Sequence, residues 1–566
     1  MKITNLKVNN FRGIKNCDIT FSESSNIVCI VGSGDSTKTT LLSAIEWVLW
    51  PSWSLQVADS DFYECAVADS IIIEISLIGV PKTLLTQEKF GLFLRSGPIL
   101  SDENDEPIDD HTNCITIRLS IESDFEPHWE VVCNRKEPKP ISNRDRQLLS
   151  LGVIGQNSEK DFTWNRYSVL QRYAESKGVI KEALISSLRD ASNHADLSEL
   201  DTISDKLVAI GKDYGVGFKG RINSRLFING SSINSSVGLF DEDTPFLLRG
   251  KGSQRLVSMG LNIGVTDEGT VLLIDEIEAG LEPYRLRSLI GKLRTRIPSN
   301  GQVIMTTHSP VTVCECNVDE LFIARSHVGT TTLTPMKAEN ITINEFVQSQ
   351  VRKNPEAFLG RRLIVCKGKT EIGFIRALDS FLDFNHKFRM ASEGVSYCLG
   401  NGDETIEVAK LFSSFGYEVC ILMDSDKHAD EIMEKELFDK WNIPTFAWEI
   451  GNSIEEQIFK DVPNEVAEEL LQIPIDDKGF HLVAEKLKDV LDISVTGKFS
   501  LVGFTSDQRR HIGTISKANS KETQSWYKRI DLGEEMGNVV FDNWSQIEDS
   551  TNLKTVLQKL IDWIIQ

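Results

Sequence analysis

The chain has 566 residues, of which 40% are hydrophobic and 25% are charged, and its net charge at pH 7 is −22. This length predicts more than one domain, and no apolar run approaches the roughly 20 residues that a membrane helix needs. The composition is that of a soluble globular protein, and the negative charge argues against a protein that coats nucleic acid through bulk electrostatics.

The N-terminal residues alternate between apolar and polar, which predicts strands. The alternation from residue 3 to residue 31 breaks at Arg12-Gly13 and at residues 22–25, so we expect a short antiparallel meander. A charged segment leading into an apolar signal is not seen here, and we therefore expect a cytoplasmic protein. The ten cysteines are scattered without a zinc-type pair and are expected to be reduced thiols.

A phosphate-binding loop is predicted between an apolar strand that ends at Val31 and a helix that begins near Thr39. Small residues let backbone N–H groups surround a phosphate, while the lysine reaches the terminal phosphates and the next hydroxyl binds Mg²⁺. The usual pattern has glycine where this chain has Thr37, so taken alone the segment could also be an ordinary strand-to-helix turn. The predicted nucleotide-binding residues are Gly32, Ser33, Gly34, Asp35, Ser36, Thr37, Lys38, Thr39 and Thr40.

Two later strands complete an ATP site. Residues 271–274 are apolar and lead into Asp275 and Glu276, which predicts a buried parallel strand with Asp275 on Mg²⁺, together with Thr39, and Glu276 next to the attacking water. Residues 302–307 form another buried strand that leads into His308. The joint placement of these residues at strand ends favours an ATPase over an ordinary turn.

Residues 167–214 change to helical spacing, which predicts a helical insertion over about 165–215. Such an insertion could dimerise the protein or act mechanically, or it could be a packed cap with no separate role. The sequence does not choose between these interpretations.

The residues 10–14, Asn-Phe-Arg-Gly-Ile, and the loop residues 34–40 resemble a known group of ATPase heads. These heads occur in ABC transporters, in SMC and RecF-type DNA proteins and in the overcoming-lysogenization-defect (OLD) nucleases, which the chain resembles most. The resemblance implies a homodimer, or a higher homo-oligomer, that holds ATP between one phosphate loop and the partner's signature segment. Gly252, Ser253 and Gln254 match that segment, and His308 resembles the catalytic switch histidine.

A second βαβ pattern begins after a boundary near residue 350, so the predicted domains are 1–350 and 351–566. A buried strand at 363–366 precedes Lys367 and a helix that contains Glu371, and a second strand at 419–423 ends in Asp424 and Asp426. The i, i+2 spacing points both carboxylates the same way, which suits a divalent metal, although an Asp-x-Asp is also common at surfaces. Glu455 adds a third acidic element after Ser453, a candidate helix cap.

The second half resembles a Toprim domain, the topoisomerase-primase fold that positions Mg²⁺, or Mn²⁺, for phosphodiester chemistry. The resemblance implies that Glu371, Asp424, Asp426 and Glu455 are catalytic metal ligands and that Lys528 is the active-site lysine. Lys367 stands where that family has its first glutamate. An ammonium cannot bind Mg²⁺ and can pair with the neighbouring acids, so this substitution is expected to impair cleavage.

The sequence thus predicts an α/β protein with an ABC-type ATPase domain and a Toprim-like domain. Its expected function is ATP-dependent and metal-dependent cleavage of DNA, and the resemblance implies bacterial antiviral defence, with a partner protein or nucleic acid. The alternatives are a non-cleaving, ATP-gated DNA-binding scaffold and a RecF-like repair ATPase. Candidate DNA contacts are the basic segments 284–296, 352–362 and 509–529, each of which could equally be solvated surface.

Overall fold

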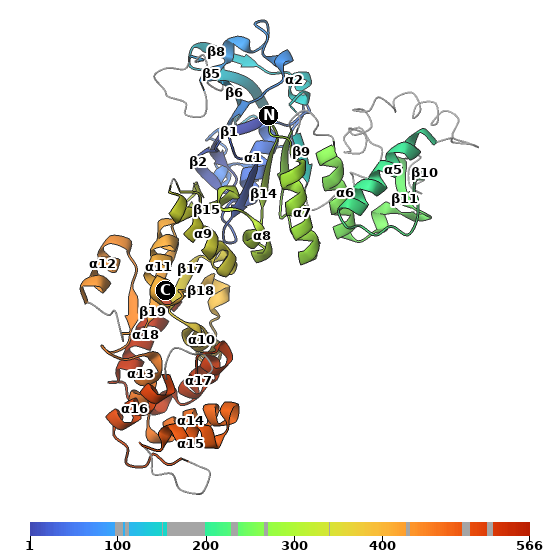
Figure 1. The fold of residues 1–566 in the computed structure, drawn as a ribbon. Coiled ribbons are helices and arrows are strands. Elements are labelled where there is room, and N and C mark those ends of the chain that lie inside the picture. Colours follow the sequence, from blue (N-terminus) through green and yellow to red (C-terminus); the bar gives the residue numbers. More distant parts are fainter. Residues whose placement is uncertain are drawn as a thin grey trace. The chain divides into compact units, whose positions relative to one another are not determined.

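The computed structural model describes residues 1–96, 106–107, 113–149, 151–154, 198–227, 236–264, 270–338, 340–425, 431–489, 499–517 and 525–566. The chain forms two compact units, Met1–Arg352 and Lys353–Gln566, and each is described by itself (Figure 1). Both units combine sheets with helices, which confirms the predicted α/β class. Among the helices in those ranges, none is both long enough and apolar enough to cross a bilayer.

The first unit contains a large mixed sheet, with 13 strands in the described part of the chain. Its strand order is β8-β7-β6-β4-β1-β2-β16-β15-β3-β14-β13-β9, and the short β5 pairs with β6. The strands are β1 (Lys2–Phe11), β2 (Ile14–Thr20), β3 (Ile27–Val31), β4 (Ile71–Ile78), β5 (Arg95–Ser96), β6 (Asn113–Ile121), β7 (Pro127–Cys133), β8 (Lys136–Pro140), β9 (Leu151–Ile154), β13 (Val271–Ile274), β14 (Gln302–Thr306), β15 (Leu321–His327) and β16 (Thr330–Pro335).

The strand that leads into the phosphate loop lies in the parallel part of this sheet. Strand β3 pairs in parallel with β14 on one side and with β15 on the other, and β13 lies beyond β14. All five residues of β3 are buried, as expected for a parallel strand covered on both faces. The predicted meander is therefore wrong in its last strand. Strands β1 and β2 do pair antiparallel, but β16 and β15 separate them from β3, because the wholly apolar β3 is buried in the sheet centre.

Helix α1 (Lys38–Val48) packs against β1, β4 and β6 and places Leu41, Ile45 and Val48 in the core of the first unit. The other described helices of this unit surround the sheet or follow it. They are α2 (Asn143–Gln147), α5 (Ser198–Asp213), α6 (Lys251–Gly264), α7 (Pro283–Arg296), α8 (Pro310–Glu315) and α9 (Ile341–Lys353). A small antiparallel sheet of β10 (Ile222–Phe227), β11 (Ser236–Asp241) and β12 (Thr244–Pro245) follows α5.

The end of the predicted helical insertion is helix α5, whereas residues 155–197 lie outside the described residues. The C-terminal residue of α5 is held by α7. Lys292 and Arg296 both pair with Asp213, at N–O distances of 2.8 and 2.5 Å, and the Lys292 ammonium lies 4.5 Å from the ring centre of Tyr214. The described end of the insertion is thus tied to the helix that follows the Asp275 strand.

The second unit contains a four-stranded sheet, in the described residues, with the order β18-β17-β19-β20. The strands are β17 (Arg362–Cys366), β18 (Val395–Leu399), β19 (Glu418–Met423) and β20 (Thr445–Ala447), and every neighbouring pair is parallel. The chain goes from β17 to β18 on one side and then returns to β19 on the other. In open parallel sheets, ligands bind beyond the carboxyl ends of the strands at such a reversal, here between β17 and β19.

Helices cover this second sheet, and most of them share one hydrophobic core. They are α10 (Lys369–His386), α11 (Thr405–Ser414), α12 (Glu431–Trp441), α13 (Ile454–Asp461), α14 (Asn464–Lys478), α15 (Phe480–Leu487), α16 (Ser506–Lys517), α17 (Ile530–Asp542) and α18 (Asn552–Ile565). Helices α10 and α17 cross closely through glycines, since a Cβ at Gly373 would lie 2.1 Å from the Ile530 carbonyl oxygen and one at Gly533 would lie 2.5 Å from that of Thr370.

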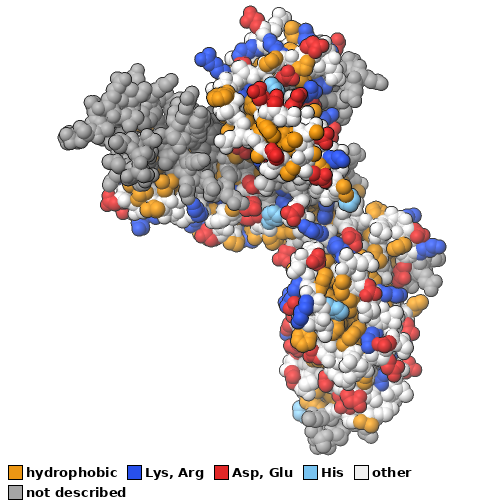
Figure 2. All heavy atoms as spheres, turned by 180° about the vertical axis from the view of Figure 1, so that it is seen from behind, with side chains coloured by type: hydrophobic (Ala, Val, Ile, Leu, Met, Phe, Trp, Pro, Cys, Tyr) orange, Lys and Arg blue, Asp and Glu red, His pale blue; other side chains and the backbone are white. Residues whose placement is uncertain are grey.

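On the face drawn in Figure 2, acidic and basic side chains are interspersed over both units. The cations of the basic helix α7 are also paired with acids; Glu282 lies just before the helix, and the other acids lie in distant parts of the chain. The pairs are Arg285–Glu282, Arg287–Glu315, Lys292–Asp213, Arg294–Glu320 and Arg296–Asp213. The predicted DNA-contacting segment 284–296 is therefore largely neutralised within the first unit.

Candidate functional site

The phosphate loop connects β3 to α1 and has two non-glycine residues in the left-handed region, Asp35 (φ 59°) and Thr37 (φ 62°). The Thr37 hydroxyl lies 2.9 Å from that of Thr331 on β16. A Cβ at Gly32 would lie 2.7 Å from the Ala324 carbonyl oxygen on β15, so only glycine fits there. The loop thus keeps its expected path although Thr37 replaces the usual glycine.

Lys38 is buried at the start of α1, and the loop's own oxygens surround its ammonium. Its Nζ donates to the carbonyl oxygens of Gly32 (3.0 Å) and Ser33 (2.7 Å) and to Ser36 Oγ (3.1 Å). Burial lowers the pKa of Lys38 to about 8, against the opposite effect of Asp275 and other carboxylates. A buried cation held mainly by neutral oxygens is suited to bind an anionic phosphate.

Asp275 follows β13 and lies next to the phosphate loop, as predicted. It accepts a hydrogen bond from Thr39 Oγ1 at 3.0 Å and another from Thr306 Oγ1 at 2.7 Å. A hydroxyl and a carboxylate side by side are the hard oxygen ligands that Mg²⁺ prefers. Thr39 and Asp275 therefore fit the ion. The remaining predicted residues of the loop and the first turn of α1 are partly or fully exposed; they are Ser33, Gly34, Asp35 and Thr40.

Glu276 and His308 follow adjacent parallel strands, β13 and β14. The Glu276 backbone has a φ of 47°, and its N–H donates to Thr306 Oγ1 at 2.8 Å. Partial burial and the Lys38 ammonium lower the pKa of His308, which favours the neutral imidazole. Sequence reasoning did not select Thr306, although three polar residues in a row, Thr306 to His308, end this apolar strand and could have drawn attention to it.

The signature-like segment opens helix α6, where Gly252 packs against the turn that follows Glu276. A Cβ at Gly252 would lie 2.2 Å from the Gly280 carbonyl oxygen, and Ser253 is half-buried. The Gln254 side chain is buried and donates to the carbonyl oxygens of Leu247 (2.6 Å) and Arg249 (2.8 Å), so its nitrogen holds the preceding turn. Its contact with a nucleotide stays a prediction.

Arg255, the next residue of α6, was not predicted as a site residue. Its guanidinium is buried and donates to the carbonyl oxygens of Asp275 and, at 2.7 Å, Glu276. It thereby ties the signature-like helix to the end of β13.

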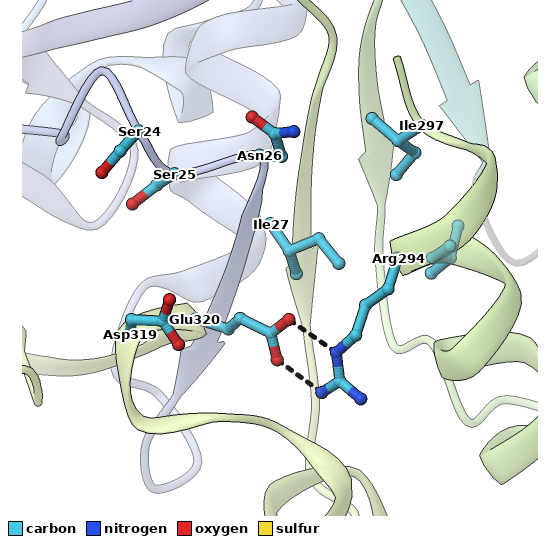
Figure 3. Close-up of a pocket in the computed structure, with 9 residues that line it drawn as sticks. Ser24, Ser25, Asn26, Ile27, Arg294, Ile297, Asp319 and Glu320 are labelled. Atoms are coloured by element: carbon cyan, nitrogen blue, oxygen red, sulfur yellow. Dashed lines mark hydrogen bonds and ion pairs between the residues drawn. The ribbon is translucent and has the colours of Figure 1, made fainter. Parts of the chain in front are cut away.

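A cavity of about 180 Å³ lies at the other end of β3 from the phosphate loop (Figure 3). The Arg294–Glu320 pair closes one wall, with two parallel hydrogen bonds of 2.7 and 2.5 Å. The cavity is separate from the residues described above. Its lining residues are Ser24, Ser25, Asn26, Ile27, Leu293, Arg294, Ile297, Asp319 and Glu320.

The second unit brings together the acidic site, which we define as Glu371, Asp424 and Glu455 with Lys367 and Lys528. Lys367 follows β17 and Asp424 follows β19, at the reversal of strand order, and their side chains pair at 3.1 Å. The other Asp424 oxygen accepts from the Ile454 N–H at 2.8 Å. The Asp426 prediction lies outside the described residues.

Helix starts position the two glutamates of the acidic site. Glu371 lies in the first turn of α10, with one carboxylate oxygen 2.9 Å from where a Cβ at Gly368 would stand. Glu455 lies in the first turn of α13, which Ser453 caps as predicted, in a capping box with Glu456. Both glutamates of the acidic site are buried.

The carboxyl groups of the acidic site are perturbed by burial and by one another. Burial and the carboxylates of Asp424 and Glu455 raise the pKa of Glu371 well above its ordinary value. Burial and the Asp424 carboxylate raise the pKa of Glu455 to about 7, against the effect of Lys528. Carboxyl groups that are buried close together fit a divalent cation such as Mg²⁺, although Lys367 already contacts one of them.

Two protein-family models match the first unit. One, described as an AAA ATPase domain, matches residues 1–122, and the other, described as an AAA domain, putative AbiEii toxin, Type IV TA system, matches residues 236–314. The first contains the phosphate loop and the second contains α6, Asp275 and His308. The predicted ATPase domain is thereby confirmed, and with it nucleotide binding, which in such domains usually involves Mg²⁺. No curated protein sequence matches the chain.

Solved structures similar to this chain include two SMC heads. One is an Smc head bound to the C-winged helix domain of ScpA, with 14% identity, a TM-score of 0.40, and coverage of 60% of this chain and 98% of that one. The other is an Smc head with an extended coiled coil bound to the C-terminal domain of ScpA, derived from Pyrococcus furiosus, with 13% identity, a TM-score of 0.38, and coverage of 62% and 99%.

Proposed function

We propose that this chain is an ATP-dependent DNA endonuclease of the OLD type, in which the first unit hydrolyses ATP and the second is a Toprim-like nuclease. The observation that carries the nuclease is the convergence of Glu371, Asp424 and Glu455 at the strand-order reversal of a parallel sheet. Two of these acids are buried with raised pKa values, as expected of a site that awaits a divalent cation.

In the first unit, Lys38 would exchange its bonds to the loop for bonds to the terminal phosphates of ATP. Thr39 and Asp275 would hold Mg²⁺, which neutralises charge on those phosphates. Glu276 would orient and polarise the attacking water, and His308 would contact the transferred phosphate from the neighbouring strand.

In the second unit, Glu371, Asp424 and Glu455 would hold Mg²⁺ or Mn²⁺, with Asp426 and Lys528 completing the site. A bound ion there would activate water and stabilise the leaving oxygen of a DNA phosphodiester. The protein's own contribution is to keep three carboxylates together on helix starts and strand ends, with Lys528 available to balance charge near Glu455.

A second candidate function is a non-cleaving, ATP-gated DNA-binding scaffold. The specific observation that favours it is the pair between Lys367 and Asp424, because the ammonium occupies a carboxylate oxygen that a metal ion would use. The substitution leaves β17 and α10 intact, so the ATPase and the fold would remain.

The proposal also includes an oligomeric state and a cellular role. Gly252 and Ser253 lie at the start of α6, where a partner subunit's nucleotide could reach them, and a homodimer or higher homo-oligomer follows. The resemblance to OLD-type proteins implies that this chain acts in the cytoplasm in bacterial antiviral defence, with a partner protein or nucleic acid. A strictly monomeric mass in solution, with and without ATP, would exclude the shared ATP site.

A plasmid-nicking assay on the full chain tests the proposal. Supercoiled plasmid is incubated with Mg²⁺ or Mn²⁺, with and without ATP, using the parent, Lys367→Glu, Asp424→Ala and Lys38→Ala. Nicking that is raised by Lys367→Glu and abolished by Asp424→Ala supports the nuclease. Binding of plasmid without nicking by either the parent or Lys367→Glu supports the scaffold, and neither binding nor nicking refutes both.

A further inference from the structure

One carboxylate connects the Glu276 turn to the His308 turn in the first unit. Glu278 Oε2 accepts from the Thr307 hydroxyl at 2.7 Å, and Oε1 accepts from the His308 backbone N–H at 2.6 Å. The Thr307 hydroxyl also accepts from the Ser309 N–H at 3.0 Å. Hydrogen bonds to Glu278 and Thr307 therefore hold the backbone on both sides of His308.

We infer that Glu278 is a positioning residue for His308 in ATP hydrolysis. Hydrogen bonds to an ionised carboxylate are shorter and roughly twice as strong as neutral ones, so these two contacts fix the turn more firmly than a neutral acceptor would. His308 precedes α8, whose first N–H groups have no partner within the helix, and the helix cap Ser309 supplies no side-chain bond. Glu278 accepts from the N–H of His308, just before this cap, while the Thr307 hydroxyl accepts from that of Ser309.

The turn that carries Glu278 is itself held in place. The Ala279 N–H donates to the Glu276 carbonyl oxygen at 2.8 Å, and Gly280 has a φ of 73° and packs against Gly252. Thr307, at the other end, is fully buried. The Glu278 side chain consequently helps to set the distance between the Glu276 and His308 turns, together with the Thr306 hydroxyl that accepts from the Glu276 N–H.

The Glu278 charge also acts on the His308 ring. It favours the protonated imidazole, in opposition to burial and to the Lys38 ammonium. A neutral side chain at position 278 removes this influence as well as one or both hydrogen bonds. The role rests on the proposed function only in that His308 contacts the transferred phosphate.

Steady-state ATPase kinetics of the full chain test the inference. Glu278→Ala is expected to lower kcat about tenfold or more while KM changes less than about threefold, because the variant misplaces His308 without touching the phosphate loop. Glu278→Gln keeps the size of the side chain but only one strong acceptor, so its kcat should lie between that of the parent and that of Glu278→Ala. Glu315 is a carboxylate on α8 that pairs with Arg287. Glu315→Gln is therefore the matched control, and its kcat and KM should resemble those of the parent.

The double variant Glu278→Ala/His308→Ala separates positioning from a general structural effect. If Glu278 acts through His308, the double variant is no slower than His308→Ala alone. Losses that multiply, an unchanged kcat in Glu278→Ala, or a change confined to KM would each overturn the inference. If Glu278→Ala does not fold, the same comparison is made with Glu278→Gln.

Amide hydrogen exchange keeps the test independent of the proposed function. A parent chain that hydrolyses no ATP refutes the proposed ATPase mechanism, and the anchoring is then tested directly. Exchange at His308 and Ser309 should accelerate about tenfold in Glu278→Ala and stay unchanged in Glu315→Gln. Equal protection in the parent and Glu278→Ala would overturn the anchoring itself.

Discussion

Replacing Lys367 by glutamate should destabilise the metal-free second unit and make its stability depend on metal. The Lys367 ammonium lies 3.1 Å from Asp424, and the two side chains are only 19% and 12% exposed. Loss of one partner of such a pair, with a new carboxylate added beside Glu371 and Glu455, should lower the free energy of unfolding by about 2–4 kcal/mol. In a unit of this size that corresponds to a midpoint about 5–15 °C lower in EDTA.

Divalent metal should reverse this loss. An ion that binds only the folded state at a hundred times its Kd adds about 2.7 kcal/mol, so Mg²⁺ or Mn²⁺ should raise the midpoint of Lys367→Glu much more than that of the parent. Thermal unfolding in EDTA and in metal measures both effects. Lys369→Glu makes the same charge change at an exposed position, the first residue of α10, and is the control.

Two results would refute this reasoning. One is an equal midpoint for the parent and Lys367→Glu in EDTA, and the other is an equal metal response in both. Either result would mean that Lys367 does not compete with a cation for Asp424, and a nicking rate unaffected by Lys367→Glu would agree with it.

Lys38→Ala should lose ATP binding, measured by equilibrium titration with a fluorescent nucleotide. Glu276→Gln should bind ATP but turn it over at least about a hundredfold more slowly. ATP binding by Lys38→Ala or normal turnover by Glu276→Gln would contradict the proposed ATP site. Gly373→Ala should lower the free energy of unfolding of the second unit by about 1–3 kcal/mol, because its Cβ meets the backbone of α17, and an unchanged denaturation midpoint would contradict this. The pKa of Glu455 is raised from 4.5 to about 7, so the folded state holds the extra proton and the metal-free protein should lose stability as pH rises through this range. Glu455→Gln should flatten that dependence.

The chemistry at strand ends was predictable from sequence because it depends on local order. Asp275 and Asp424 directly follow apolar runs that predict buried strands, and His308 follows a third such run after two threonines. The carboxyl ends of parallel strands meet at one edge of a sheet. The helix start at Ser453 was likewise visible, since its capping residues lie three positions apart.

What the sequence did not reveal depends on contacts between distant segments. The direction of the Gln254 side chain follows from how α6 docks, and the neutralisation of α7 needs Asp213, Glu315 and Glu320 from three other places in the chain. The acceptor role of Glu278 needs the strand β14 beside it. Side-chain period alone carries none of this information.

The central position of β3 in the sheet has a consequence for synthesis on the ribosome. Its parallel neighbours β14 and β15 come much later in the chain, as the pairing of Ile27 with Val303 shows. A ribosome that adds about 5–20 residues per second takes roughly 15–55 s to make the intervening stretch of about 270 residues. Meanwhile β1, β2, β4, β6 and β7 can pair among themselves, because they all precede Pro140.

Until then, a nascent chain would display β3 with both of its edges unpaired. Such an edge is apolar along its whole length and pairs readily with other chains, so nascent or truncated forms that stop before β14 should need a chaperone to remain dispersed. Residues 1–122 include every residue of the phosphate loop, yet on their own they would lack both strands that hold it in place.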